Sequence, residues 1–144
     1  MSPALRPGWM VALCAAIMWA GAWMPWLTTQ AGGGGRANGI GGAHGSLELP
    51  HGFGVSQLIV LLASALLVVG AMVGRGLSVR GASVAALVIS SVDVALVALY
   101  YQRNINGPVS AGYGLYVVAA AGVGAGVCAL WATVAALLGG RSRR

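Results

Sequence analysis

Charged residues are scarce in this chain, and their scarcity excludes an ordinary soluble domain. Only 7% of the 144 residues are charged, against roughly a quarter in typical soluble domains. Hydrophobic residues make up 58% of the chain, and the mean hydropathy is +0.85. There is no lysine, and the only acids are Glu48 and Asp93. A chain with so little polar surface is expected to lie in a lipid bilayer.

Motifs that carry chemistry are missing as well. The sequence has no Ser-His-Asp set, no paired catalytic carboxylates, no Cys-x-x-Cys and no phosphate-binding Gly-x-x-x-x-Gly-Lys. No histidine falls in an apolar stretch, so a haem held by two histidines between helices would have no ligands. We therefore expect no enzyme and no cofactor. The high pI of such a chain does not imply a nucleic-acid partner either.

Four long apolar stretches account for the hydrophobic excess. They cover residues 9–27, 55–74, 82–101 and 113–138. Each has about 19 residues or more, which at about 1.5 Å rise per residue can cross a hydrocarbon core of about 30 Å. The sequence therefore predicts an all-α membrane protein with four transmembrane helices in a single domain, residues 1–144.

The first stretch has an alternative interpretation as a cleaved signal peptide. Arg6 precedes the apolar run, and the small residues at 20–22 are typical of a cleavage site. Against this, the apolar run continues through Trp26 and Leu27, which favours a full span. Pro25 lacks an amide donor, so we expect the helix to end or kink near it.

Arginine predicts the orientation of the chain. Arg36 and Arg103 lie at one set of stretch ends, and six arginines lie at the other. These six are Arg6, Arg75, Arg80, Arg141, Arg143 and Arg144. The positive-inside rule then places both termini in the cytoplasm and the loop 28–54 outside a bacterial plasma (inner) membrane.

A short internal echo supports a pairing of the helices. The segment GFGV at 52–55 opens the second stretch, and GYGL at 112–115 opens the fourth. Both begin outside, so the chain is expected to form two helical hairpins in the same orientation. Chance is the alternative, because the chain has 24 glycines.

Aromatic residues gather at the predicted outer boundary of the stretches. Indole and phenol rings prefer the headgroup level of a bilayer. We expect an interfacial belt of six residues, Trp23, Trp26, Tyr100, Tyr101, Tyr113 and Tyr116.

The outer loop 28–54 divides into two halves. Its first half is so rich in glycine that it is expected to be mobile, since little apolar area offsets its ordering entropy. In its second half Leu47 and Leu49 alternate with polar residues, which predicts a short strand or turn. His44, His51 and Glu48 are weak metal-ligand candidates, and solvent exposure is the simpler interpretation, so we expect no metal site.

Asp93 is the acid that falls inside an apolar stretch. It lies about halfway along 82–101, where a charged carboxylate costs at least about 2.5 kcal/mol. No Lys, Arg or His in the spans would neutralise it. We expect a protonated group that bonds Ser90, Ser64 or a backbone carbonyl, or one that pairs with another chain. A proton or cation relay is the functional alternative to a structural hydrogen bond.

Small residues on the fourth stretch predict a close helix contact. Gly122 and Gly126 form a small-xxx-small pair, and Ala121 and Ala125 extend it. The facing helix can belong to this chain or to another. Cys14 and Cys128 fall at a similar predicted depth and are interpreted as small apolar residues.

These features together resemble a loose group of uncharacterised four-helix membrane proteins of actinobacteria. The resemblance rests on MPWL at the end of the first span, the glycine-rich outer segment, GSLEL leading to GFGV, the arginine-flanked inner turn and GYGLY. Claudin-like proteins share a four-helix plan with a tryptophan in the first outer loop, but the loop cysteines they rely on are absent here. Neither resemblance carries functional residues over.

The sequence favours a multipass accessory or interaction protein of the inner membrane. Its expected partners are the lipid bilayer and either other membrane subunits or further copies of itself. The expected contacts are the glycine-rich face of the fourth span and the outer loop. The alternative is a small ion- or proton-coupled transport component that uses Asp93.

Overall fold

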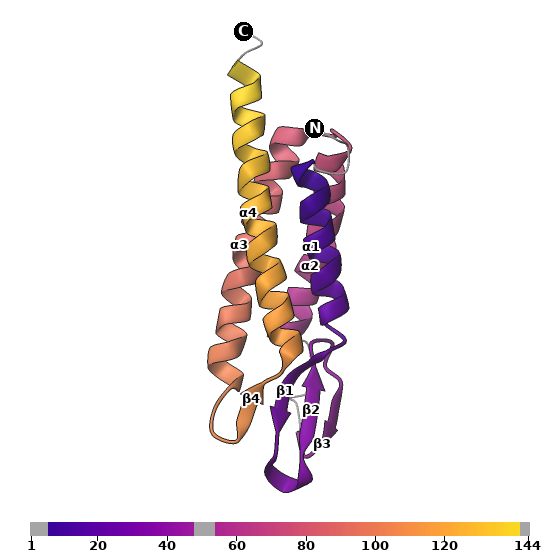
Figure 1. Ribbon diagram of the computed structural model, residues 1–144, viewed down its shortest axis with the longest axis vertical. Helices are drawn as coiled ribbons and strands as arrows, with labels where there is room; N and C mark the ends of the chain where they lie inside the picture. Colours follow the sequence, from indigo (N-terminus) through magenta and orange to yellow (C-terminus); the bar gives the residue numbers. More distant parts are fainter. Residues whose placement is uncertain (1–5, 48–53, 142–144) are drawn as a thin grey trace.

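Four helices lie side by side, and a small β-sheet covers one end of the bundle (Figure 1). The computed structural model describes residues 6–47 and 54–141. The helices are α1 (Pro7–Gly21), α2 (Val55–Gly74), α3 (Val79–Asn104) and α4 (Tyr113–Arg141). The strands are β1 (Pro25–Thr29), β2 (Gly35–Asn38), β3 (Ala43–Gly45) and β4 (Val109–Ala111), and a short 3₁₀ turn, Ala31–Gly33, joins β1 to β2.

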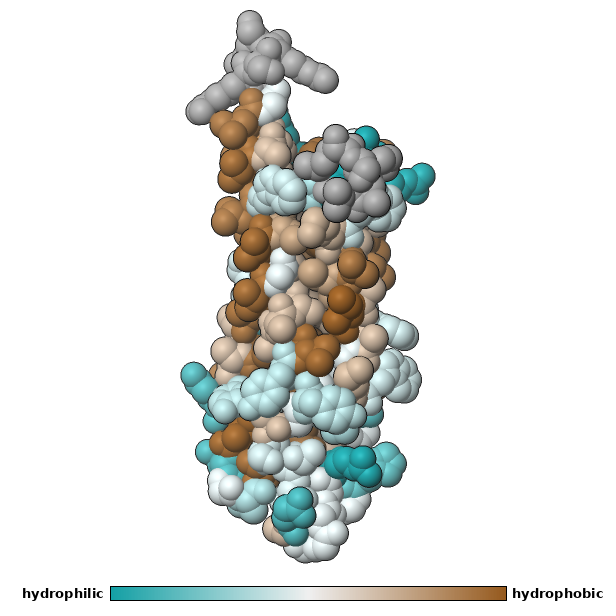
Figure 2. Space-filling view, in the orientation of Figure 1, coloured by the Kyte–Doolittle hydropathy of each residue, from teal (hydrophilic) through white to brown (hydrophobic). Residues whose placement is uncertain are grey.

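Three of the helices, α2, α3 and α4, are long and apolar enough to cross a membrane. They indicate a membrane protein, as the composition predicts. Their apolar side chains form the brown body between the two more polar ends in Figure 2. The mostly helical fold is therefore confirmed, although the sequence did not predict the sheet.

The first helix is shorter than the predicted span of residues 9–27. It ends at Gly21 after 15 residues, a length of about 22 Å. The chain cannot continue as a helix because Pro25 has no amide to donate, and Trp26 and Leu27 instead enter strand β1. The prediction of a helix through Leu27 was wrong.

The helices pack as antiparallel neighbours around a square. Helix α1 contacts α2 and α4, and α3 contacts the same two helices. Glycine lets α1 and α2 approach closely, because a Cβ at Gly70 would lie 2.8 Å from the backbone nitrogen of Ala12. The first turn of α1 and the last turn of α4 lie at the end of the bundle away from the sheet (Figure 1).

The sheet joins the two helical hairpins. Its strand order is β3-β2-β1-β4, with every pair antiparallel. Along the chain, β1, β2 and β3 come between α1 and α2, whereas β4 comes between α3 and α4. The pairing of Leu27 with Ala111 therefore joins the connection between α1 and α2 to the connection between α3 and α4.

Part of the glycine-rich half of the outer loop forms strand β2 of this sheet, where the sequence predicted a mobile segment without secondary structure. Its backbone pairs in strands β2 and β3, and this bonding offsets the ordering entropy. Glycine supplies the turns, as at Gly41, where φ is +100°. The short strand or turn predicted around Leu47 and Leu49 is only partly described: β3 ends at Gly45, Ser46 lies in a turn, and Leu49 lies outside the described residues.

Each face of the sheet has a different character. Leu27 and Ala37 point to the helix ends and are 2% and 1% exposed. The opposite face carries a polar row, one residue from each strand, in the order His44, Arg36, Thr28 and Ser110. The hydroxyls of Thr28 and Ser110 lie 3.0 Å apart and share a hydrogen bond. The sheet therefore packs one face on the helix ends and turns its polar face away from the bundle.

Trp26 fixes the sheet to the helices. A bulge between Pro25 and Leu27 turns its indole inward, and the side chain is 0% exposed. The Nε1–H donates to the carbonyl of Gly21 at 2.9 Å, and the ring meets Tyr100 edge-on with centroids 5.3 Å apart. One side chain thus contacts the end of α1, the sheet and α3.

Candidate functional site

Asp93 occupies a core position of the bundle. The buried residues of α3 follow spacings of three and four, which is the pattern of a helix that packs along one face. This inward face comprises Ser83, Ala86, Ser90, Asp93, Val97 and Tyr100. Asp93 is 0% exposed. The acid that the sequence places about halfway along an apolar stretch is therefore fully buried in the bundle.

Three helices meet at the level of Asp93. A Cβ at Gly122 of α4 would lie 3.4 Å from Cγ2 of Val94 and 3.6 Å from Cε of Met18. Val94 follows Asp93 on α3, and Met18 belongs to α1. These distances are ordinary van der Waals contacts, so Gly122 marks the level at which α1, α3 and α4 meet, although a methyl group would also fit there.

Ser64 falls at the same level on α2. Gly70 of α2 lies beside Ala12 of α1, and the two helices run in opposite directions. Ser64 precedes Gly70 by as many residues as Met18 follows Ala12, so both lie at one height in the bundle. All four helices therefore contribute a residue to the layer that contains Asp93.

The predicted hydrogen bonds to Asp93 are not formed. The hydroxyl of Ser90 donates to the carbonyl of Leu87 at 3.1 Å, and that of Ser64 donates to the carbonyl of Val60 at 3.0 Å. Within residues 6–47 and 54–141, neither carboxyl oxygen of Asp93 has a hydrogen-bond partner. A serine hydroxyl on a helix finds its nearest acceptor one turn back, and this local bond competes with the carboxyl.

The small residues of α4 pack inside this chain. Ala121 is 9% and Ala125 is 0% exposed. Gly122 lies against α1 and α3, and a Cβ at Gly126 would lie 3.7 Å from the hydroxyl of Ser90. The glycine-rich face is thus already covered by the chain's own helices, so it is not the free docking face that the sequence suggested.

The predicted aromatic belt divides into exposed and buried members. Trp26 and Tyr100 are 0% and 5% exposed, and they pack on each other in the core rather than facing lipid. The other four rings are exposed near the sheet end of the bundle: Trp23, Tyr101, Tyr113 and Tyr116. Inward rotation by the strand bulge explains Trp26, and the position of Tyr100 on the inward face of α3 explains its burial.

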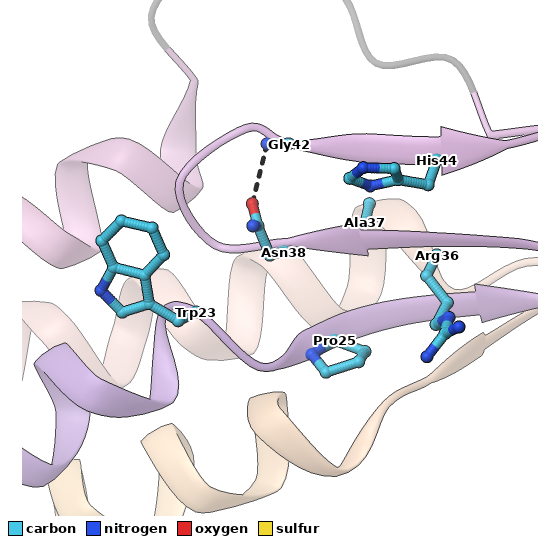
Figure 3. Close-up of a pocket in the computed structure, with 7 residues that line it drawn as sticks. All are labelled: Trp23, Pro25, Arg36, Ala37, Asn38, Gly42 and His44. Atoms are coloured by element: carbon cyan, nitrogen blue, oxygen red, sulfur yellow. Dashed lines mark hydrogen bonds between the residues drawn. The ribbon is translucent and has the colours of Figure 1, made fainter.

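A shallow hollow lies between the turn that follows α1 and the sheet strands β1, β2 and β3. It has a volume of about 360 Å³ and is lined by Trp23, Pro25, Arg36, Ala37, Asn38, Gly42 and His44 (Figure 3). The positions of these residues in the sequence follow no motif or periodic spacing that would have predicted a common site. Strand pairing sets Arg36 opposite His44, and that pairing was not predictable from either residue alone.

The remaining candidates form no cluster. In the described part of the chain no three His, Cys, Asp or Glu side chains come together. Glu48 and His51, which were considered with His44 as metal ligands, lie outside that part. Cys14 and Cys128 are free thiols, both half-buried.

We expect Asp93→Ala to leave the free energy of unfolding unchanged or to raise it by about 1 kcal/mol. A buried polar group without a partner costs about 1–3 kcal/mol, and this exceeds the cost of the small cavity that alanine leaves. Denaturant titration of the purified protein in mild detergent measures the difference. A loss of more than about 2 kcal/mol would instead mean that Asp93 holds the helices together through a stabilising bond.

Comparisons with known protein families, with curated proteins and with solved structures found no match.

Proposed function

We propose that this protein is an accessory or interaction subunit of a membrane assembly, and that it contacts its partner through the outer face of the sheet. The observation that supports this proposal is the polar row of one residue per strand on that face, from His44 to Ser110. The partner is another membrane protein with a segment outside the bilayer.

The organisation of the chain supports this choice of surface. Helix packing uses the small residues of α4 internally, as the burial of Ala125 illustrates. The sheet, in contrast, projects beyond the bundle (Figure 1) and gathers segments from both connections at that end. A rigid sheet with an ordered polar face needs less ordering on association than a flexible loop, so less free energy is lost on binding.

We expect a photo-crosslinking residue at Ser110 to give a discrete adduct in intact membranes. The matched control carries the crosslinking residue in place of Val127. This position is 64% exposed, but it lies on the apolar surface of α4 and not on the sheet. Mass spectrometry of the adduct distinguishes a different subunit from a second copy, and either supports the proposal. The proposal fails when Ser110 gives no adduct and native purification yields only the monomer.

A substitution on the sheet face tests the same contact independently. Thr28→Glu places a charge in the polar row, and we expect it to weaken the Ser110 adduct. Gln102→Glu puts the same charge on exposed α3 near its sheet end and is expected to leave the adduct unchanged. Equal effects of both substitutions would show that the adduct depends on charge at this end and not on the sheet face.

A second candidate function is proton- or ion-coupled transport through Asp93. It is favoured by one observation, the complete burial of a carboxyl group without a hydrogen-bond partner among the described residues. Ionisable groups inside the hydrocarbon are costly to retain and often serve proton or ion movement. This function is separable from docking, because it resides in the bundle and not in the sheet.

We expect, under this second candidate, that Asp93→Asn abolishes proton flux into proteoliposomes loaded with a pH-sensitive dye. The amide keeps the shape of the side chain but cannot take up and release a proton. Ser91→Ala is the control, since Ser91 is exposed on the same helix and bonds only the carbonyl of Leu87. Wild-type protein that carries no flux above empty vesicles would reject the candidate.

A further inference from the structure

We infer that the hollow between Trp23 and the sheet binds the phosphate headgroup of an anionic phospholipid. The hollow lies between Trp23, in the turn after the apolar helix α1, and the polar side of the sheet, and headgroups of a bilayer would meet the molecule at this boundary. This site does not depend on the proposed protein partner. The hollow shares Arg36 and His44 with the polar row that is proposed to meet the partner, and a lipid bound there would leave Thr28 and Ser110 free for that partner.

The polar lining offers hydrogen-bond donors for an anion. Figure 3 places Arg36 and His44 at one end of the hollow and Trp23 at the other, with Asn38 and Gly42 between them. No carboxylate belongs to the described lining residues. A guanidinium presents a planar fork of N–H groups that matches two oxygens of one phosphate.

The strand register brings two of these donors together. Arg36 and His44 are direct partners across β2 and β3, so their Cβ atoms lie about 5 Å apart on one face of the sheet. Because antiparallel pairing holds both backbones, the two side chains can reach one phosphate without rearrangement of the strands.

Asn38 adds a third donor and also holds the turn. Its Oδ1 accepts the amide of Gly42 at 2.7 Å and that of Ile40 at 3.2 Å. Both bonds use the oxygen, which leaves the Nδ2 hydrogens directed away from these amides. The turn that closes one side of the hollow is therefore fixed before any ligand arrives.

The other end of the hollow suits an acyl chain. Trp23 is 61% exposed, and its ring meets that of Trp19 edge-on with centroids 6.1 Å apart. Trp19 is 48% exposed on α1, so the two indoles continue the hollow onto the apolar surface of the helix. A free phosphate would use only Arg36 and its neighbours, whereas a phospholipid uses both ends. The structure therefore favours the lipid.

The dimensions agree with a headgroup rather than a whole lipid. A volume of about 360 Å³ is at the lower end of the range of about 300–1,000 Å³ for small-molecule sites. The headgroup fills the hollow, and the tails remain in the bilayer against α1.

The test is competitive lipid retention by the full-length protein. Nanodiscs with equal amounts of phosphatidylglycerol and phosphatidylcholine are dissolved in mild detergent, and native mass spectrometry counts each lipid that stays bound. We expect wild-type protein to retain phosphatidylglycerol preferentially. Arg36→Gln is expected to lower that preference about fivefold, the equivalent of about 1 kcal/mol for one basic side chain near a lipid phosphate. His44→Gln, a second exposed position, is expected to lower it less.

Matched variants separate this site from general surface charge. Arg103→Gln removes an exposed arginine at the same end of the bundle that does not line the hollow, and it should leave the preference unchanged. Trp23→Ala should lower retention of both lipids, because it removes the apolar contact that they share. The inference is overturned by no preference in the wild type, or by equal effects of Arg36→Gln and Arg103→Gln. Retention of inorganic phosphate by a wild-type protein that keeps neither lipid would likewise overturn it, since the site would then bind a free anion.

Discussion

Trp26→Ala is expected to destabilise the protein by about 3–5 kcal/mol, the range for large aromatic residues removed from a packed core. The indole is 0% exposed and lies between the end of α1, the sheet and Tyr100. Its removal also leaves the carbonyl of Gly21 without the Nε1–H that bonds it at 2.9 Å. Denaturant unfolding in mild detergent, followed by circular dichroism, measures the loss.

Trp23→Ala is the matched control for this prediction. Trp23 is only three residues away but 61% exposed, so we expect a change within about 0.5 kcal/mol. Trp26→Phe should fall between them, because it keeps most of the packing and loses one hydrogen bond of about 1 kcal/mol. Similar losses for Trp23→Ala and Trp26→Ala would contradict the buried position of Trp26.

Gly70→Ala is the second substitution with a large expected effect, a loss of about 1–3 kcal/mol. The new Cβ would lie 2.8 Å from the backbone nitrogen of Ala12 and 3.0 Å from Cγ1 of Val11. Backbone atoms cannot move aside as a flexible side chain can, so α1 and α2 have to separate. The same denaturant titration measures the change.

Gly139→Ala provides the opposite expectation at a comparable position. Gly139 is also helical, but nothing lies within 4 Å of the Cβ that alanine would add. Alanine has a higher helix propensity than glycine by about 1 kcal/mol, so this variant should be at least as stable as the wild type. If Gly70→Ala were equally stable, the close approach of α1 and α2 would be wrong.

The helices of the bundle were largely predictable because each one is a continuous run of apolar residues in the sequence. A run such as Val55–Gly74 is apolar for the length of a bilayer, so its sequence alone predicts the helix. The boundaries of α2 matched the predicted 55–74 for this reason. The mid-span position of Asp93 was also predictable, whereas its partner was not, because an acid in an apolar run avoids lipid either inside its own bundle or against another chain.

The sheet was not predictable by the same means. Its strands have only three to five residues, and β2 and β3 contain glycine and alanine, which have little strand propensity. They pair because the helices bring β1 and β4 together, which is information that lies in the tertiary arrangement. Trp26 illustrates the consequence. Its position near the end of an apolar run predicted a ring at the lipid boundary, whereas a bulge in β1 directs the ring into the core.

The candidate sites differ in the same way. Asp93 could be named from the sequence because its chemistry is unusual where it stands. Arg36 and His44 are ordinary loop residues in the sequence, and only the register of β2 and β3 makes them neighbours. Sites built from the surface of a sheet therefore need the fold before they can be recognised.

The pairing of β4 with β1 has a consequence for biogenesis. Strand β1 follows the first helix, but its neighbour β4 is synthesised only after the third. During synthesis β1 therefore has one open edge until α3 and the segment that follows it have been made. A protease added to stalled nascent chains should cut near Thr28 before that moment and be blocked after it. Closure of the sheet would thus mark the docking of the second helical hairpin on the first.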